Sequence, residues 1–295
     1  MIVEKKVPFS YILNKVRYDL LFVLALSILI NLAANRFTNR IPEMPLSVAA
    51  FLGTAISILL SFKLSQSYDR WWEARKVWGA IVNDSRSLIL QLQQFAGTDA
   101  PLQRLAHRQI AWCYVLGRSL RGQPPLDGIG DLLQEAELER VATHRNMPLA
   151  LLRQHGADLR ALQEAGQLSW YGQVQLDATL VRLTDAMGKA ERINGTVFPV
   201  TYRLFLHYAI YLFVVVLSIA LKDVAPVFEI PLLVLIASVF FLLEKSAFHL
   251  QDPFRNRPSD IPVTAIARTI EINIRQLMGE ADIPGPATPE GFYLL

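Results

Sequence analysis

Four long apolar segments constrain the fold of this chain more than any other feature of its sequence. A helix needs about 20 mostly apolar residues, at about 1.5 Å each, to cross the roughly 30 Å hydrocarbon core of a bilayer. Each segment has that length, and the run Leu20–Ala34 is nearly free of polar residues. Buried helices of a large soluble protein are the alternative, and they fit such a run poorly. The predicted membrane segments are residues 18–35, 45–62, 197–221 and 224–243.

The composition agrees with a membrane protein and excludes several other classes. Charged residues make up 19% of the 295 residues, against about 25% in average soluble domains. The basic residues are spread along the chain rather than gathered in a stripe, so we expect no nucleic acid partner. The single cysteine, Cys113, excludes an internal disulfide and a cysteine cluster for a metal. No small-residue cleavage site follows the first ten residues, so we expect no removable signal peptide.

The apolar segments divide the chain into five regions. The prediction is an N-terminal arm over 1–17, two membrane helices within 18–62, a helical region over 63–196, two membrane helices within 197–243, and a C-terminal helix and tail over 244–295. Leucines at helical spacing, such as Leu176, Leu180 and Leu183, predict amphipathic helices in the central region.

The basic residues near the membrane segments predict their orientation. The N-terminal arm carries more Lys and Arg than either short loop does, and such residues favour the cytoplasmic side. We therefore expect both termini and residues 63–196 to face the cytoplasm. The residues behind this prediction are Lys5, Lys6, Lys15 and Arg17 in the arm, and Arg36, Arg40 and Lys222 in the loops.

The second apolar segment is followed by "SYDRWWEARKVWGAI", Ser67 to Ile81, which is aromatic, charged and helical in its spacing. Nothing between Pro45 and Ala96 interrupts a helix except two glycines, so one long helix is predicted to leave the membrane here. Trp71 and Trp72 are then expected at headgroup level, where indole packs its ring and keeps its N–H hydrated. Together with Arg70 they are predicted to anchor this helix at the interface.

Side chains for catalysis or metal binding form no recognised pattern. The five histidines are scattered without metal-ligand spacing, and the sequence contains no phosphate loop, nucleophile elbow or HExxH. His249 lies three residues before Asp252, which fits the end of a helix before Pro253 better than a catalytic pair. We therefore predict neither an enzyme nor a bound metal or other cofactor.

One stripe of the second membrane helix has a spacing suited to a pore. Thr54, Ile58 and Phe62 recur every four residues and drift by about 40° at each step, so they share a narrow face. One chain with four membrane helices cannot surround a pore with such a stripe, but several copies around a symmetry axis can. An apolar ring formed in this way controls passage by dewetting. Core packing is the ordinary alternative for a stripe of this kind.

Three motifs resemble the bestrophin family. "SYDRWWEARKVWG", residues 67–79, is similar to its signature, in which an Arg-Trp-Trp triplet closes the pore helix. "FLLEKSAFHLQDPFRNRPSDIPVTAIARTIEINI", Phe241 to Ile274, resembles the bacterial branch, with its Asp-Pro-Phe, its Asp-Ile-Pro and its Arg-Thr-Ile-Glu helix. "VFPVTYRLFLH", Val197 to His207, resembles the entry into the third membrane helix. The similarity is collinear over essentially the whole chain.

The resemblance implies an all-α membrane protein that assembles as a homopentameric ion channel in the bacterial inner membrane. It implies a hydrophobic neck at three positions, which fall here on Thr54, Ile58 and Phe62, with threonine at the outermost place. It also implies a second, cytosolic constriction before the third membrane segment, and counting back from Pro199 puts this near Tyr171. The partners so implied are other copies of the chain, membrane lipid and permeant monovalent ions.

The resemblance also carries expectations about ions. Animal bestrophins bind calcium through an acidic run after Asn-Pro-Phe, and "RNRPSD" here leaves only Asp260. Because calcium takes six or more oxygen ligands, we expect no activation by calcium. An apolar neck carries no charge, so the sign of the conducted ion depends on other residues. Likeness to the bacterial branch favours cations such as sodium, with a chloride channel and a non-conducting scaffold as the alternatives.

Overall fold

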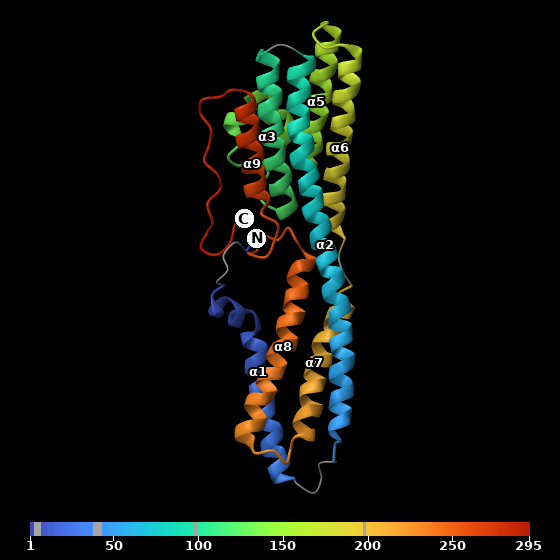
Figure 1. Cartoon of the computed structure of the whole chain (residues 1–295), viewed down its shortest axis with the longest axis vertical. Coiled ribbons are helices and arrows are strands. Elements are labelled where there is room, and N and C mark those ends of the chain that lie inside the picture. The colour runs from blue at the N-terminus through green and yellow to red at the C-terminus, as the bar shows by residue number, and fades with distance from the viewer. Residues whose placement is uncertain (3–6, 38–42, 97–98, 197–198) are drawn as a thin grey trace. The chain divides into compact units, whose positions relative to one another are not determined.

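The computed structural model describes residues 1–295 except 3–6, 38–42, 97–98 and 197–198 (Figure 1). Lys5, Lys6, Arg40 and Val197, which entered the predictions above, lie outside the described residues. The described part of the chain is built from α-helices and one short 3₁₀ helix. They are α1 (Phe9–Arg36), α2 (Leu46–Phe95), α3 (Asp99–Arg121), η1 (Gly130–Leu132), α4 (Glu135–Ala142), α5 (Met147–Glu164), α6 (Trp170–Gly195), α7 (Val200–Ala220), α8 (Pro226–Gln251) and α9 (Val263–Leu277).

Four of these helices, α1, α2, α7 and α8, are long and apolar enough to cross a membrane, and each covers all or most of one predicted segment. The long second helix is also confirmed, since α2 continues for 50 residues. Helix α1 begins at Phe9, directly after Pro8. Residues 9–17 of the predicted N-terminal arm are therefore helical, because nothing after Pro8 breaks a helix.

The chain forms two compact units. The membrane unit consists of residues 4–71 and 197–252, and the helical unit of residues 1–3, 72–196 and 253–295. Helix α2 contributes to both, with Trp71 as its last residue in the membrane unit.

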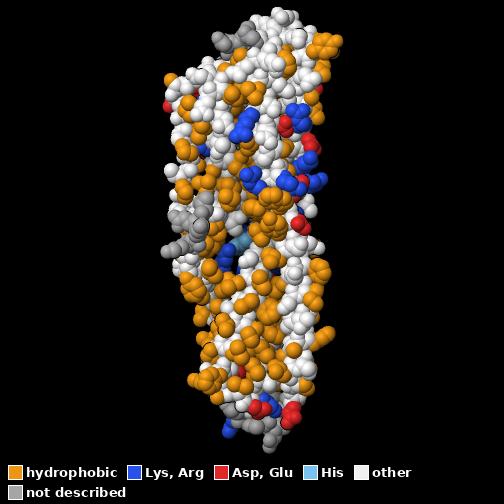
Figure 2. All heavy atoms as spheres, in the orientation of Figure 1, with side chains coloured by type: hydrophobic (Ala, Val, Ile, Leu, Met, Phe, Trp, Pro, Cys, Tyr) orange, Lys and Arg blue, Asp and Glu red, His pale blue; other side chains and the backbone are white. Residues whose placement is uncertain are grey.

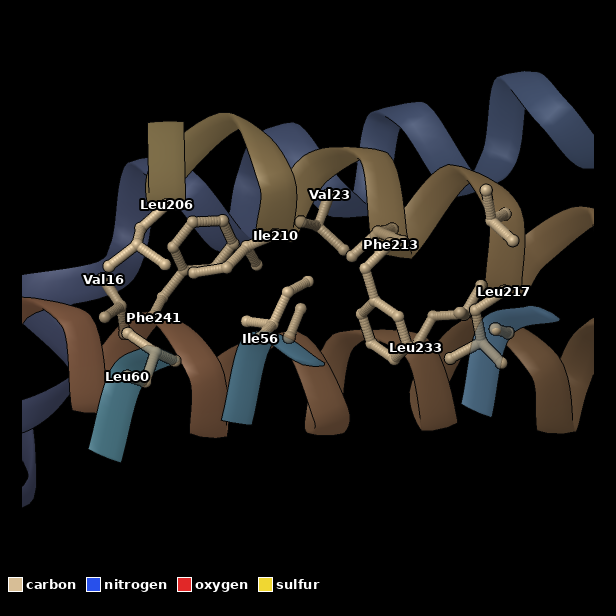
Figure 3. Close-up of a cluster of buried hydrophobic side chains, with 14 residues drawn as sticks. Val16, Val23, Ile56, Leu60, Leu206, Ile210, Phe213, Leu217, Leu233 and Phe241 are labelled. Carbon is tan, nitrogen blue, oxygen red and sulfur yellow. The ribbon is translucent and has the colours of Figure 1, made fainter. Parts of the chain in front are cut away.

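The core of the membrane unit is formed by side chains from all four of its helices (Figure 3). Ile56 and Leu60 of α2 point into this core, which also includes Phe213 of α7. Gly53 lets α2 approach α7 closely, because a Cβ atom at this position would lie 3.0 Å from the Phe213 ring. On the face shown in Figure 2, hydrophobic side chains also cover most of the outer surface of this unit.

Glu229 is a buried acid of the membrane unit, and its hydrogen bonds explain how an apolar segment carries it. Its side chain is 1% exposed. Ser218 Oγ donates to one carboxylate oxygen over 2.8 Å, and Asn31 Nδ2 donates to the other over 3.1 Å. A buried polar group is tolerated when its hydrogen bonds are made, so Glu229 links α8 to α7 and α1.

Helix α3 is the centre of the helical unit and packs against α5, α6 and α9. Arg108 of α3 is 1% exposed and forms salt bridges to Glu137 of α4 and Asp158 of α5. The contact to Asp158 is 2.6 Å, and Arg104 one turn earlier also reaches Asp158, at 3.1 Å. Arg108 thus neutralises two carboxylates from neighbouring helices.

We predict that Arg108→Ala destabilises the helical unit by about 3–5 kcal/mol, because it leaves the buried carboxylate of Glu137 without its partner. Thermal unfolding of the purified protein, followed by circular dichroism, measures the loss. Arg104→Ala is the matched control, because the Arg104 side chain is 44% exposed and we expect it to contribute less than about 1 kcal/mol. Equal midpoints for the two variants would contradict this role of Arg108.

Candidate functional site

One face of α2 in the membrane unit is left uncovered by the other helices of that unit. Ile58 is 52% exposed and Phe62 is 63% exposed, whereas Ile56 and Leu60 on the opposite face are 4% and 2% exposed. The core-packing explanation of this stripe is therefore wrong for the single subunit, because its residues point away from the core. We call this uncovered face the α2 stripe.

The three predicted neck residues all belong to the α2 stripe. At about 100° per residue, Thr54 and Phe62 lie about 40° on either side of Ile58. Thr54 is exposed, and its hydroxyl donates to the carbonyl oxygen of Ala50 over 2.8 Å. The threonine hydroxyl is therefore satisfied within its own helix, which makes this position less polar than its sequence suggests.

Two further residues extend the stripe and were not predicted from the sequence. Phe51 is 74% exposed, and Asp69 is also exposed. They lie seven residues before and eleven residues after Ile58, which places each about 20° from it around the helix. Their spacing from Ile58, about two and three helical turns, is the sequence signal that indicates both residues. Phe51 supplies the large apolar side chain that Thr54 does not, and Asp69 ends the stripe with a carboxylate.

Hydroxyl groups also distinguish the α2 stripe from the exposed apolar surface of α1 between Leu20 and Ala34. Ser57, Ser61 and Ser65 are exposed on or beside it. In α1 the corresponding stretch exposes only apolar residues, and its one serine, Ser27, is fully buried and donates to the carbonyl oxygen of Val23. Thr54 and Ser57 donate to carbonyl oxygens one turn earlier in α2, and small hydroxyl side chains of this kind suit a face that packs closely against another helix.

The predicted interfacial anchors lie where α2 passes from one unit to the other. The Trp71 ring is stacked on that of Tyr68, with ring centres 6.2 Å apart, and Asp252 lies close enough to attract the Arg70 guanidinium. Trp72 is 47% exposed. Partial exposure suits a ring at headgroup level, and the anchoring role stays a prediction.

Tyr171 lies in the helical unit, in the first turn of α6, and is 84% exposed. Ser169 caps this helix by accepting a hydrogen bond from the Gly172 N–H over 3.1 Å. A Cβ atom at Gly172 would lie 3.0 Å from Phe95 of α2, so the glycine lets the start of α6 contact the end of α2. The cap and this contact fix the position of Tyr171 within the unit.

Asp260 is fully buried in the helical unit. Burial raises the pKa of its carboxyl, although one oxygen accepts a hydrogen bond from the Arg257 N–H over 3.1 Å and Arg121 attracts it. Among the described residues, no group of three His, Cys, Asp or Glu side chains could hold a metal ion. A buried carboxyl beside arginines lacks the oxygen ligands that calcium takes.

Cys113 of α3 is fully buried, and burial raises the pKa of its thiol to about 12. Ser85 and Gln109 lie within hydrogen-bond distance of its sulfur. Because the thiolate is the reactive form, this native cysteine is inert in the folded protein.

Comparison with known proteins identifies the family of this chain. Residues 7–276 match the family model described as bacterial/fungal bestrophin protein. The chain is 32% identical to the voltage-dependent anion channel-forming protein YneE of Escherichia coli K12, over 96% of this chain and 93% of that protein. It is 30% identical to the protein of the same name from Salmonella typhi, with the same coverage.

Solved structures show the same fold. The structure of a bacterial bestrophin homolog from Klebsiella pneumoniae superimposes with a TM-score of 0.85 at 28% sequence identity, over 90% of this chain and all of that chain. The family model covers nearly the whole chain and the relatives align almost end to end, so the predicted resemblance is confirmed. The chain belongs to the bacterial bestrophin family of membrane ion channels.

Proposed function

We propose that five copies of this chain assemble around a central axis, with the α2 stripe of each lining the narrowest part of an ion pore. The observation that carries this proposal is the mixed character of the stripe. Ile58 and Phe62 are exposed apolar residues, yet exposed hydroxyls accompany them along the same helix. This mixture of apolar side chains and hydroxyls suits a face turned to an intermittently wetted pore.

The neck so formed is a hydrophobic barrier that conducts when it is wetted. Rings of Ile58 and Phe62 exclude water when narrow, and Phe51 extends the apolar lining beyond Thr54. Tyr171 is proposed to form a second constriction on the cytosolic side, where its 84% exposure leaves it accessible. In this proposal the helical unit and both termini lie in the cytoplasm, and the channel lies in the bacterial inner membrane and needs no calcium.

We further propose that the channel prefers monovalent cations such as sodium. Asp69 lies about 10 Å along the helix axis from Phe62 and on nearly the same face. Five carboxylates at one end of the neck attract cations and repel anions, as acidic rings do in cation channels. The support is a fixed negative charge at the point where the apolar lining ends.

An anion channel is the second candidate, and the printed names of the relatives favour it. The Escherichia coli and Salmonella proteins are named as voltage-dependent anion channel-forming. A non-conducting scaffold with the same fold is a third possibility, and it predicts an assembled protein that passes no current.

Phe62→Ala tests whether the stripe limits conduction. Removing five phenyl rings widens and wets the neck, so we expect the single-channel conductance in planar bilayers to rise at least about twofold. Phe228→Ala is the matched control, since Phe228 is a 70% exposed phenylalanine of α8, and it should leave conductance unchanged. If both variants conduct like the wild type, the stripe does not limit the current.

Asp69→Asn tests the cation preference. Under a sodium chloride gradient, we expect the reversal potential of the wild type to lie near the sodium equilibrium potential, and that of Asp69→Asn to move toward zero. Asp69→Glu keeps the charge and should behave like the wild type. A wild-type reversal near the chloride potential would establish the anion channel instead, while an unchanged reversal in Asp69→Asn would remove Asp69 as its determinant.

A further inference from the structure

A basic cavity of about 500 Å³ lies within the membrane unit, between α1, α7 and α8. Its cationic lining comes from all three helices, with Lys15 on α1, Arg203 on α7 and Lys245 on α8. The volume falls within the usual range of about 300–1,000 Å³ for ligand sites. Such a concentration of positive charge is unusual for a unit built from apolar helices, and the conduction pathway proposed above does not use it.

The cavity lies near the ends of its helices. Lys15 lies six residues after the start of α1, and Arg203 lies three residues after the start of α7. Lys245 lies six residues before the end of α8. At about 1.5 Å per residue, all three lie within about 9 Å of a helix end. Helix ends of this kind meet the headgroup region of a bilayer, where phosphate groups are concentrated.

Two carboxylates in this region are already engaged. Asp19 lies 3.2 Å from Lys245 Nζ and 3.6 Å from His207 Nε2. Glu244 lies 3.2 Å from His207 Nδ1. Arg203 forms no salt bridge with the described residues, and its guanidinium instead lies 4.8 Å from the centre of the Phe248 ring. This cation–π contact uses no N–H group of Arg203 in a salt bridge, so those donors can serve an anion.

Lys63 of α2 adds a buried positive charge to the same region. It is 1% exposed, and its Nζ has no hydrogen-bond partner among the described residues. Glu244 attracts it and Arg203 repels it, so it lies near the basic cavity. Lys63, Arg203 and Lys245 carry three positive charges against the two carboxylates Asp19 and Glu244, which leaves an excess of one. A buried charge such as that of Lys63 is costly in a membrane unless a counter-ion lies close to it.

We propose that this cavity binds the phosphate group of an anionic membrane lipid. The phosphate compensates the excess positive charge and accepts hydrogen bonds from Arg203, which suits phosphate oxygens through its planar fork of donors. Exposed apolar side chains at the cavity rim, Leu204 and Tyr208, continue the lining outward along α7. They offer a surface for acyl chains, and inorganic phosphate, which shares the same recognition chemistry, has no such chains.

The test is native mass spectrometry of the delipidated protein in detergent, titrated with phosphatidylglycerol, with phosphatidylcholine or with inorganic phosphate. We expect the wild type to retain phosphatidylglycerol in preference to phosphatidylcholine, and Arg203→Gln to bind phosphatidylglycerol roughly tenfold more weakly. Lys15→Gln should weaken binding in the same direction. Arg17→Gln is the matched control, because Arg17 is an exposed α1 arginine outside the cavity. The subunit mass distribution of each variant checks that it assembles.

Two results would overturn the proposal. Equal retention of phosphatidylglycerol by the wild type, Arg203→Gln and Arg17→Gln would show that the cavity is not the lipid site. Displacement of phosphatidylglycerol by equimolar inorganic phosphate would show that the site takes free phosphate rather than a lipid headgroup. Neither result depends on ion conduction, so the lipid site and the pore are tested separately.

Discussion

Helix α2 packs against the rest of the membrane unit through one face only, and the proposed function depends on this. The packed face carries Ile56 and Leu60, and Gly53 brings it into contact with Phe213. Because the faces of an α-helix recur with its period, burying one face of α2 presents the opposite face as a continuous stripe. The apolar residues, the hydroxyls and the carboxylate of that stripe then act together only if copies of the chain bring their stripes to a common axis.

The charges of the membrane unit are organised by depth. Glu229, buried near the start of α8, accepts hydrogen bonds from the neutral side chains of Ser218 and Asn31. At the other end of the unit the cationic side chains outnumber the carboxylates. The positive excess lies at the basic cavity between α1, α7 and α8, and the negative charge of Asp69 lies on the α2 stripe. The proposed lipid site and the proposed pore therefore occupy different surfaces of the unit.

The membrane helices and the exposed face of α2 were predictable from the sequence, because the length of an apolar run and the spacing of its residues are local properties. The four membrane helices, the long α2 and the face shared by Thr54, Ile58 and Phe62 follow from apolar runs and helical spacing. Phe51 and Asp69 were equally local and were missed, because only steps of four residues were considered rather than steps of two and three turns. The start of α1 at Phe9 was missed because the apolar run begins later than the helix.

Contacts between distant segments were not predictable in this way. Asp19 and Lys245 are far apart in the sequence, and nothing in either neighbourhood indicates that they pair. The surroundings of Lys63 likewise come from α7 and α8, so the burial of its ammonium without a hydrogen-bond partner among the described residues is visible only in the folded unit. A single sequence gives the faces of helices, whereas the partner of each face is a property of the tertiary structure.

Cysteine modification tests whether the α2 stripe lines a water-filled pore. The current through Ile58→Cys channels is recorded before and after a charged, water-soluble methanethiosulfonate reagent is added. The native Cys113 is buried and its pKa is raised to about 12, so we expect the reagent to leave the current of the wild type unchanged. If the α2 stripe lines a water-filled pore, the reagent alters the current of Ile58→Cys and leaves Ile56→Cys, which faces the core, unaffected. An unchanged current in Ile58→Cys, from protein shown to be assembled and conducting, would contradict the account.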